Sequence, residues 1–340
     1  MRIALACIAL LLSIAPAAAL EARAVNDADW APRKSAKVAK AAVDPLLVKA
    51  QVLLDRARFS PGEIDGRPGD NFNKAVAAFA AQHGIAGVTE LTEEIWRKLA
   101  AVSAEPALTE YTIAPEDVRG PFAKRIPAKF EDMQHLPAMA YTSMREKLAE
   151  KFHMSEALLA ALNPGRDLSR AGETIWVANV AGPRPDAKAA RIEVDKTVQT
   201  LKAFDRDGNL IAFYPATAGS ADKPAPAGRL KVVGVRENPH YRYNPAYAFK
   251  GVRTRQPFTI NPGPNSPVGA VWIGLSGEGF GIHGTPAPDR IGKTQSHGCI
   301  RLTNWDALAL AAVTGKGTPV DFTGDEQARL AKAQAPRRRR

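Results

Sequence analysis

The sequence predicts a multidomain α+β protein with three folded parts. We expect a small three-helix domain, a small α/β module, and a larger, mostly β domain of sandwich or barrel-like type with one helix after Cys299. The length of 340 residues exceeds one ordinary domain. Apolar residues make up 45% of the chain and charged residues 24%, which allows a packed core in each part. Apolar residues recur at helical spacing in the first half of the chain. In the second half they form short runs between Gly and Pro turns.

The first residues predict an exported protein. The segment MRIALACIALLLSIAPAAAL has a positive charge at Arg2, an apolar run over residues 3–14 and small residues at 17–19. This is the pattern of a signal peptide that is cut near Ala19. A retained anchor is the alternative, but the run is shorter than the roughly 20 residues that span a bilayer. We therefore expect residues 1–19 to be removed, no transmembrane segment in the mature chain, and a periplasmic location.

The charge of the chain predicts an anionic neighbour. The formal net charge is +11, and the terminal PRRRR contributes four arginines to it. Outside the cytoplasm, a membrane surface or an acidic wall polymer fits a basic protein, and nucleic acid is not expected as a partner. We expect residues 324–340 to be a solvated basic tail.

Residues 43–103 are expected to form the three-helix domain, after an unstructured, Ala- and Lys-rich lead over residues 20–42. Apolar residues recur at helical spacing in DPLLVKAQVLLDRA and NKAVAAFAAQHG, and Gly84 ends the second helix. A third helix, TEEIWRKLA, has Thr92 as its N-cap. The turn-rich FSPGEIDGRPGD separates the first two helices.

The three-helix domain resembles the peptidoglycan-binding domain of wall-directed proteins. The matching residues are Phe59, Gly62, Ile64, Asp65, Gly66, Gly69, Ala75, Val76, Phe79 and Gln82. The resemblance implies contact with peptidoglycan glycan strands. A helical bundle that only spaces the other domains is the alternative.

The next segments are expected to be an extended connector over residues 104–137 and a small module over residues 138–182. The module is predicted to contain two short helices, of which Asn163 ends the second, followed by a strand. It is similar to the glycan-binding LysM module, with LNP and AGETIWV at the corresponding positions.

Residues 190–323 are expected to form the mostly β domain. ARIEVDKTVQTLKAF alternates apolar and polar residues before a turn at Asp207 and Gly208, and GRLKVVGV, QPFTINPG, GAVWIGLSG and FGIHG follow at loop-separated intervals. Many short strands of this kind favour a sandwich or a barrel. The helix after Cys299 is predicted from TNWDALALAAVTG.

Cys299 is the residue that most needs an explanation. If Cys7 is lost with the signal peptide, Cys299 is the only thiol of the mature chain. One cysteine cannot form a disulfide within its own chain, so it pairs with another molecule, lies buried and inert, or acts as a nucleophile.

The surroundings of Cys299 favour the nucleophile. A thiol with a reference pKa of about 8.5 is mostly protonated at neutral pH, so it needs a base or a positive charge nearby. Arg301 is two residues away, which puts both side chains on one face of an extended segment. His297 and His283 are both candidate bases. Spacing does not decide between them, although His283, on a separate strand, can be oriented independently.

Two glycines could complete such a site. The backbone carbonyl of Gly284 could orient the imidazole of His283. Gly298 lacks a Cβ, so a substrate carbonyl could approach the N–H groups of Gly298 and Cys299, which would stabilise an oxyanion.

These residues together resemble the HG…SHGCIR signature of the L,D-transpeptidase family, whose catalytic domain is called YkuD. The segments PAPAGRLKV and NSPVGAVWIGLS extend the resemblance over residues 190–323. It implies that Cys299 is the nucleophile and His283 the general base. It also implies oxyanion or supporting roles for His297, Gly298 and Gly284, and substrate contacts for Ser296, Arg301 and the lid residues Tyr241 and Tyr243, which lie near His240 and Tyr247.

The resemblance also implies the reaction. The thiolate would attack a diaminopimelate carbonyl in a tetrapeptide stem of peptidoglycan, release D-alanine and leave a thioester, which an amine then resolves. The acceptor would be a second diaminopimelate, giving a cross-link, or a lysine of an outer-membrane lipoprotein. No metal and no cofactor is implied.

Three alternatives remain. A hydrolase of the same family would use water as the acceptor, either trimming stems or detaching a lipoprotein. A non-catalytic wall-binding protein would keep the site without activity. A zinc site of His283, His297 and Cys299 is disfavoured, because no Cys-x-x-Cys pair or His-Glu-x-x-His helix accompanies these residues.

Overall fold

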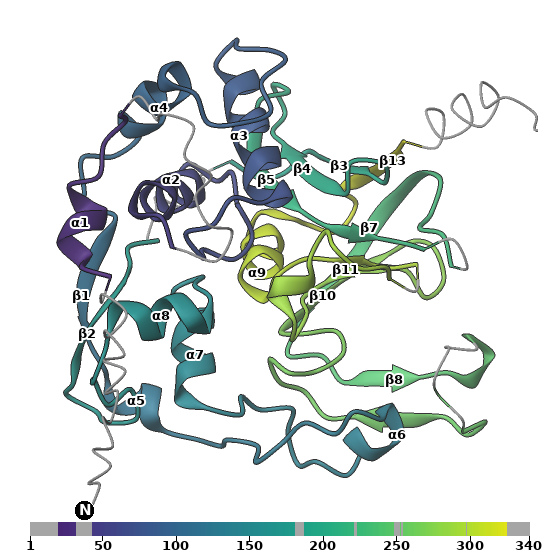
Figure 1. The fold of residues 1–340 in the computed structure, drawn as a ribbon. Coiled ribbons are helices and arrows are strands. Elements are labelled where there is room, and N and C mark those ends of the chain that lie inside the picture. The colour runs from purple at the N-terminus through teal and green to yellow at the C-terminus, as the bar shows by residue number, and fades with distance from the viewer. Residues whose placement is uncertain are drawn as a thin grey trace, which may run out of the picture.

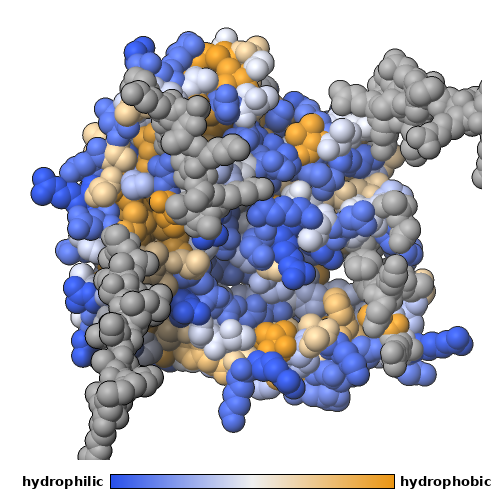
Figure 2. Space-filling view, viewed as in Figure 1, coloured by the Kyte–Doolittle hydropathy of each residue, from blue (hydrophilic) through white to orange (hydrophobic). Residues whose placement is uncertain are grey.

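The structure is a computed structural model that describes residues 20–31, 43–180, 187–220, 223–247, 252, 254–296 and 298–324. The predicted signal peptide, His297 and nearly all of the predicted basic tail lie outside these residues. Hydrophilic residues cover most of the face in Figure 2, with apolar residues in smaller groups between them. No helix within the described ranges is long and apolar enough to cross a bilayer.

The N-terminal unit, residues 43–103, contains the helices that its apolar spacing predicts. They are α2 (Pro45–Arg56), α3 (Asp70–Gln82) and α4 (Glu93–Ala100). The Asp44 carboxylate caps α2 by accepting from the N–H of Leu46, and the Thr92 hydroxyl caps α4 by accepting from the N–H of Ile95. The helices enclose a core of buried apolar side chains that includes Leu53, Leu54, Val76, Phe79, Ile95 and Leu99.

The prediction of an unstructured lead over residues 20–42 is wrong for its first part. Residues Ala22–Asn26 form α1, which buries Ala22 and Val25. The side-chain amide of Asn26 donates to the carbonyl of Leu108 (3.0 Å) and accepts from its N–H (2.8 Å). This long-range pairing holds the helix, and no local periodicity announces it.

The middle unit, residues 104–180, has four short helices between two strands, whereas the sequence predicted a connector followed by two helices and a strand. Its added first strand pairs antiparallel with the last, from Leu108↔Ala178 to Thr112↔Thr174. The prediction of an extended connector is therefore wrong at this strand, which is only five residues long and whose partner lies far along the chain. The elements are β1 (Leu108–Thr112), α5 (Pro115–Val118), α6 (Phe130–Met133), α7 (Met144–Lys151), α8 (Glu156–Leu162) and β2 (Thr174–Ala178).

The third part is mostly β, as predicted, and the described residues place nine strands in one sheet in the order β5-β4-β3-β13-β7-β10-β11-β12-β6. Only Ala216 separates β5 from β6, although these strands stand at opposite ends of that order. The sheet must therefore curve round on itself, which gives it a barrel-like form. Its strands are β3 (Arg191–Asp195), β4 (Thr200–Phe204), β5 (Leu210–Pro215), β6 (Thr217–Ala218), β7 (Gly228–Glu237), β10 (Val271–Leu275), β11 (Gly281–His283), β12 (Ile300–Arg301) and β13 (Pro319–Thr323).

Helix α9 (Asn304–Val313) is the helix predicted after Cys299, and it packs on the sheet. Figure 1 shows it between the sheet and the helices α2 and α7. A separate antiparallel pair, β8 (Tyr241–Tyr243) and β9 (Phe258–Ile260), lies apart from the sheet, near α6. The short helices η1 (Pro245–Tyr247) and η2 (Pro288–Arg290) lie in loops.

The N-terminal unit is joined to the other two parts through backbone hydrogen bonds. Residues 58–60 lie along the outer edge of β5, where the N–H of Phe213 donates to the carbonyl of Arg58 (2.8 Å) and the N–H of Ser60 donates to the carbonyl of Phe213 (3.0 Å). Ile64 pairs with the middle unit by accepting from the N–H of Ser155 (2.9 Å) and donating to the carbonyl of His153 (2.8 Å). The three parts are therefore in direct contact.

Candidate active site

The pairing of β11 with β12 brings the predicted nucleophile and base together. The two strands run parallel, with Ile282 opposite Ile300 and His283 opposite Arg301. Both isoleucines are buried in the core of the sheet, so His283 and Arg301 occupy the other face. Cys299 directly precedes β12, and the positive charge of Arg301 lowers the pKa of both Cys299 and His283. Arg301 therefore lies close to both groups.

The imidazole of His283 is buried, oriented and neutral. His283 is only 4% exposed, and its Nδ1 lies 2.7 Å from the carbonyl oxygen of Gly284. A carbonyl can only accept, so Nδ1 carries the hydrogen and Nε2 keeps a free lone pair. Burial, reinforced by the charge of Arg301, lowers the pKa of His283 to about 3. At neutral pH this side chain can accept a proton at Nε2.

The indole of Trp272 covers one face of that imidazole. The two rings are stacked, with centroids 5.5 Å apart and an interplanar angle of 18°. Trp272 and His283 are direct partners in the β10–β11 pairing, and the indole crosses Gly281, where a Cβ would overlap the ring. Trp272 is not among the site residues predicted from the sequence. The glycine two residues before the histidine, opposite a tryptophan-bearing strand, is the signal that points to it.

Cys299 is half-buried, and its Sγ lies 3.5 Å from the carbonyl oxygen of Gly279. Burial raises the pKa of the thiol, and a backbone hydrogen bond to Gly281 and the charge of Arg301 act in the opposite direction. Since the pKa of His283 is lowered, the resting pair is a neutral thiol and a neutral imidazole. The proton must then leave sulfur as the sulfur attacks, which makes His283 suited to general base catalysis.

The loop before Cys299 is held by the hydroxyl of Ser296. This oxygen accepts from the N–H of Gly219 (2.7 Å) and donates to the carbonyl of Cys299 (2.5 Å). Ser296 is only 2% exposed, so its hydroxyl supports the loop, and the predicted substrate contact does not fit its geometry. Gly298 has a φ of +102°, and a Cβ there would lie 3.1 Å from a ring carbon of Phe280, so the loop needs glycine at this position.

The predicted lid residues lie in different settings. The charge of Arg301 interacts with Tyr241, whose ring also meets Phe130 edge-on at a centroid distance of 5.9 Å. Tyr243 is only 3% exposed and stacks on Phe258 at 4.7 Å, so the predicted substrate contact of Tyr243 does not fit this structure. Arg301 itself donates to the carbonyl of Gln295 (3.2 Å), and burial lowers its pKa.

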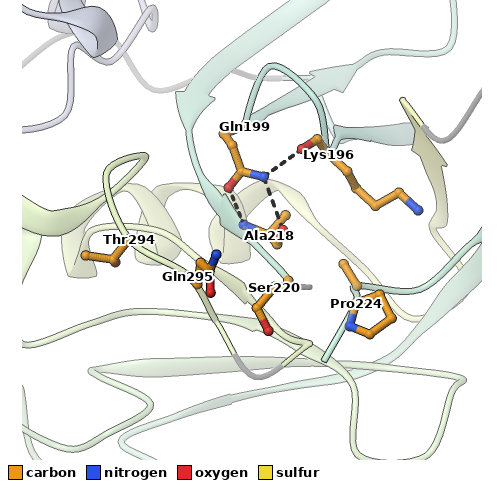
Figure 3. A pocket seen from close by; sticks show the side chains of 9 residues that line it. Lys196, Gln199, Ala218, Ser220, Pro224, Thr294 and Gln295 are labelled. Carbon is orange, nitrogen blue, oxygen red and sulfur yellow. Dashed lines mark hydrogen bonds between the residues drawn. The ribbon is translucent and has the colours of Figure 1, made fainter. Parts of the chain in front are cut away.

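A pocket lies next to the loop that carries Cys299 (Figure 3). The side chain of Gln199 forms part of its wall and bonds both backbone groups of Ala218, accepting at 2.7 Å and donating at 3.1 Å. This places the pocket beside β6 and Ser296, because the N–H of Ser296 donates to the carbonyl of Gly219. The pocket, which the sequence did not predict, is lined by Lys196, Gln199, Ala218, Gly219, Ser220, Pro224, Ala225, Thr294 and Gln295.

The described part of the chain contains no group of three or more His, Cys, Asp or Glu side chains arranged to hold a metal ion. His297, a member of the alternative zinc site and of the predicted oxyanion site, is outside that part.

Comparisons with known proteins concern the second half of the chain. Residues 189–322 match the YkuD L,D-transpeptidase catalytic domain. The chain is 34% identical to the putative L,D-transpeptidase YkuD of Bacillus licheniformis over 180 residues, which cover 52% of this chain and 92% of that protein. It is 27% identical to the probable L,D-transpeptidase YbiS of Escherichia coli over 190 residues, or 53% of this chain and 60% of that protein. The solved structure of L,D-transpeptidase 3 from Mycobacterium tuberculosis is 16% identical with a TM-score of 0.34, and the match covers 46% of this chain and 77% of that one.

Proposed function

The chain belongs to the L,D-transpeptidase family, and we propose that it is a cysteine acyltransferase that acts on the stem peptides of peptidoglycan. The observation that carries the proposal is the pairing of β11 with β12, which brings His283, with a free Nε2, to the face that carries Cys299 and Arg301. A nucleophile, a base and a positive charge are the components that acyl transfer by a thiol requires.

In the proposed reaction, Sγ of Cys299 attacks the carbonyl at the L-centre of diaminopimelate in a tetrapeptide stem. Nε2 of His283 takes the thiol proton and returns it to the nitrogen of the departing D-alanine. The products of this half are free D-alanine and a thioester on Cys299. An acceptor amine then attacks the thioester carbonyl, His283 removes the proton from that amine, and the restored thiol leaves.

Other groups support the charged stages of this reaction. The N–H groups of Gly298 and Cys299 are proposed to stabilise the oxyanion, for which the bare Cα of Gly298 leaves room. Arg301 is proposed to bind a stem carboxylate near Tyr241. His297 is proposed to shape the same site, and no metal or cofactor enters the reaction.

The acceptor is proposed to be an amine, either a second diaminopimelate or a lysine of an outer-membrane lipoprotein. The pocket beside the Cys299 loop supports a peptide acceptor, because it lies in the same region as the thioester and Gln295 is among the residues that line it. Hydrolysis is the second candidate, since it uses the same residues with water as the acceptor.

The location and the accessory units are part of the same proposal. We place the mature enzyme in the periplasm, with the N-terminal unit and the middle unit binding glycan strands. Weak binding by two tethered units would raise the local concentration of stem peptides at the active site.

Incubation with meropenem followed by intact mass measurement tests the nucleophile. A single adduct is expected on the mature chain, with loss of the adduct in Cys299→Ala and retention in the control Ser169→Ala, which alters an exposed loop of the middle unit. A chain that takes up no meropenem, or an adduct that persists in Cys299→Ala, rejects the proposal in favour of a non-catalytic wall-binding protein.

Incubation with defined muropeptides tests the acceptor. Cross-linked dimers, or conjugates with a lipoprotein C-terminal peptide, are expected together with free D-alanine, and all should vanish in Cys299→Ala. Release of shortened monomers alone would assign the hydrolase.

A further inference from the structure

The first turn of α9, directly after the strand that follows Cys299, contacts both accessory units. The side chain of Asn304 meets Glu150 of the middle unit, and the ring of Trp305 stacks on His153 of the same unit at 5.2 Å. Asp306 accepts from the hydroxyl of Ser60 of the N-terminal unit at 2.9 Å. Both accessory units therefore contact α9, the helix that follows β12.

Asn304 uses its whole side-chain amide in this contact. It is only 1% exposed, and its Nδ2 donates to both carboxylate oxygens of Glu150 (3.0 and 3.1 Å) and to the carbonyl of Pro264 (3.1 Å). Its Oδ1 accepts from the N–H of Ala270 (2.9 Å). A side chain with this many partners has a single orientation.

Oδ1 of Asn304 packs against Gly284, the residue whose carbonyl orients His283. A Cβ on Gly284 would overlap Oδ1 of Asn304, and so would a Cβ on Gly269, so the amide is packed directly between these two backbones. The carbonyl of Gly284 is the group that accepts from Nδ1 of His283 at 2.7 Å. A shift of Asn304 therefore moves the backbone that sets the direction of Nε2.

Within the middle unit, Glu150 has a second partner in addition to Asn304. It lies on α7, and its Oε1 also accepts from the hydroxyl of Tyr141 at 2.9 Å. Glu150 is half-buried, and burial raises its pKa to about 7. The path from the middle unit to the base thus runs through consecutive contacts, from Tyr141 and Glu150 to Asn304, Gly284 and His283.

We infer that Glu150 is a positioning residue for the catalytic base, and that through Asn304 the middle unit holds Gly284 and the imidazole of His283 in the orientation that faces Cys299. The inference rests on the proposed function for the role of His283. It assigns the middle unit a part in the chemical step in addition to any binding of glycan.

The test replaces Glu150 and follows acylation by meropenem in stopped-flow measurements, which separate the initial binding constant from the acylation rate constant. Glu150→Ala should lower the acylation rate constant about tenfold and leave the initial binding constant within twofold, because a base displaced by a fraction of an ångström affects the chemical step. Glu150→Gln should restore most of the rate, since its amide oxygen can still accept from Asn304. The matched control is Glu156→Ala, which removes an exposed carboxylate of the same unit.

A spectroscopic measurement makes the test independent of activity. The proton on Nδ1 of His283 should give a strongly downfield resonance in histidine-labelled protein, assigned by its loss in His283→Gln. In Glu150→Ala this resonance should move upfield or broaden, and in Glu156→Ala it should stay in place. If Glu150→Ala does not fold, Glu150→Asp, whose shorter side chain withdraws from Asn304, should show the same changes in a smaller form.

Folded Glu150 variants with an unchanged acylation rate and an unchanged Nδ1 resonance overturn the inference. Equal losses in Glu150→Ala and Glu156→Ala overturn it as well, because they indicate a general loss of stability. A wild-type chain that takes up no meropenem rejects the proposed function, whereas the resonance still decides whether Glu150 positions His283.

Discussion

Two histidines of this chain each stack on a tryptophan, yet their pKa values shift in opposite directions. His283 and His153 each stack on a tryptophan, at centroid distances of 5.5 and 5.2 Å, and each engages a partner through Nδ1. The partner of His283 is the carbonyl of Gly284 at 2.7 Å, whereas the partner of His153 is the carboxylate of Asp55 at 3.0 Å. The charge on the partner is the main difference between the two sites.

That difference decides what each imidazole can do. Burial lowers the pKa of His283 to about 3, and its uncharged partner does little to oppose this. Burial acts in the same direction on His153, but the carboxylates of Asp55, Asp306 and Glu150 outweigh it, so the pKa of His153 is raised. A neutral imidazole can serve as a base, and a charged one can hold an interface between domains. The partner of Nδ1 therefore separates the proposed base His283 from His153, which lies between domains.

Replacement of each histidine should separate the two roles most strongly. His283→Ala should lower the rate of Cys299 acylation by about 10²–10⁴-fold, the usual contribution of a general base. His153→Ala should leave that rate within a few-fold but lower the melting temperature. Meropenem acylation and calorimetry measure the two effects, with the exposed His83→Ala as control. Similar losses of acylation in both variants would falsify the distinction.

Gly284→Ala tests whether the carbonyl partner is needed for the catalytic histidine. The new Cβ would overlap Oδ1 of Asn304, so the carbonyl should move and the acylation rate should fall by about 10–100-fold. Gly315→Ala is the matched control, because nothing lies within 4 Å of its added Cβ. A Gly284→Ala enzyme as fast as the control would show that the orientation of His283 comes from Trp272 alone.

Asp55→Asn tests the charged partner of the structural histidine. Loss of the carboxylate should lower the free energy of unfolding by about 2 kcal/mol near pH 5.5, the usual value of a charged hydrogen bond. Because the pKa of His153 is raised in the folded state, this contribution is complete below the unfolded pKa and disappears as pH rises through the folded pKa. Urea titrations at pH 5.5 and pH 9 should therefore show a smaller effect at pH 9.

The control for Asp55→Asn is Asp27→Asn, which removes an exposed ion pair with Arg23 and should change stability by less than about 0.5 kcal/mol at either pH. A loss of stability in Asp55→Asn that grows toward pH 9 would contradict a charged His153.

The pH dependence of thiol alkylation should show the smallest but most direct sign of a neutral catalytic pair. Burial raises the pKa of Cys299 and lowers that of His283, so iodoacetamide should react faster as pH rises through 9, with no plateau between pH 5 and 7. A plateau in that range would indicate a thiolate and imidazolium pair. Mass measurement of alkylated Cys299 gives the rates.

The family could be predicted because its signature is short and local. HG and SHGC lie in two brief segments, and the short strands around them predicted a mostly β domain of sandwich or barrel-like type. The N-terminal helices were predictable for the same reason, since each has its own apolar period and cap.

The errors concern residues whose setting depends on distant partners. Nothing near Asn26 or Leu108 indicates that they bond to each other, so α1 and β1 were missed. Ser296 belongs to the signature, but its hydroxyl holds the loop before Cys299, because it bonds to the backbone of Gly219, which lies far away in the sequence. Asn304 lies in the segment predicted as a helix, and its partner Glu150 comes from a distant part of the chain.

Residues 58–60 form backbone hydrogen bonds along the outer edge of β5, and a shortened chain would lack them. A fragment that began near residue 187 would keep Cys299 and His283 but would leave the backbone of Phe213 without the two hydrogen bonds it makes with Arg58 and Ser60. An open strand edge recruits edges of other molecules. In the full chain, residues 58–60 of the N-terminal unit occupy this edge of the sheet.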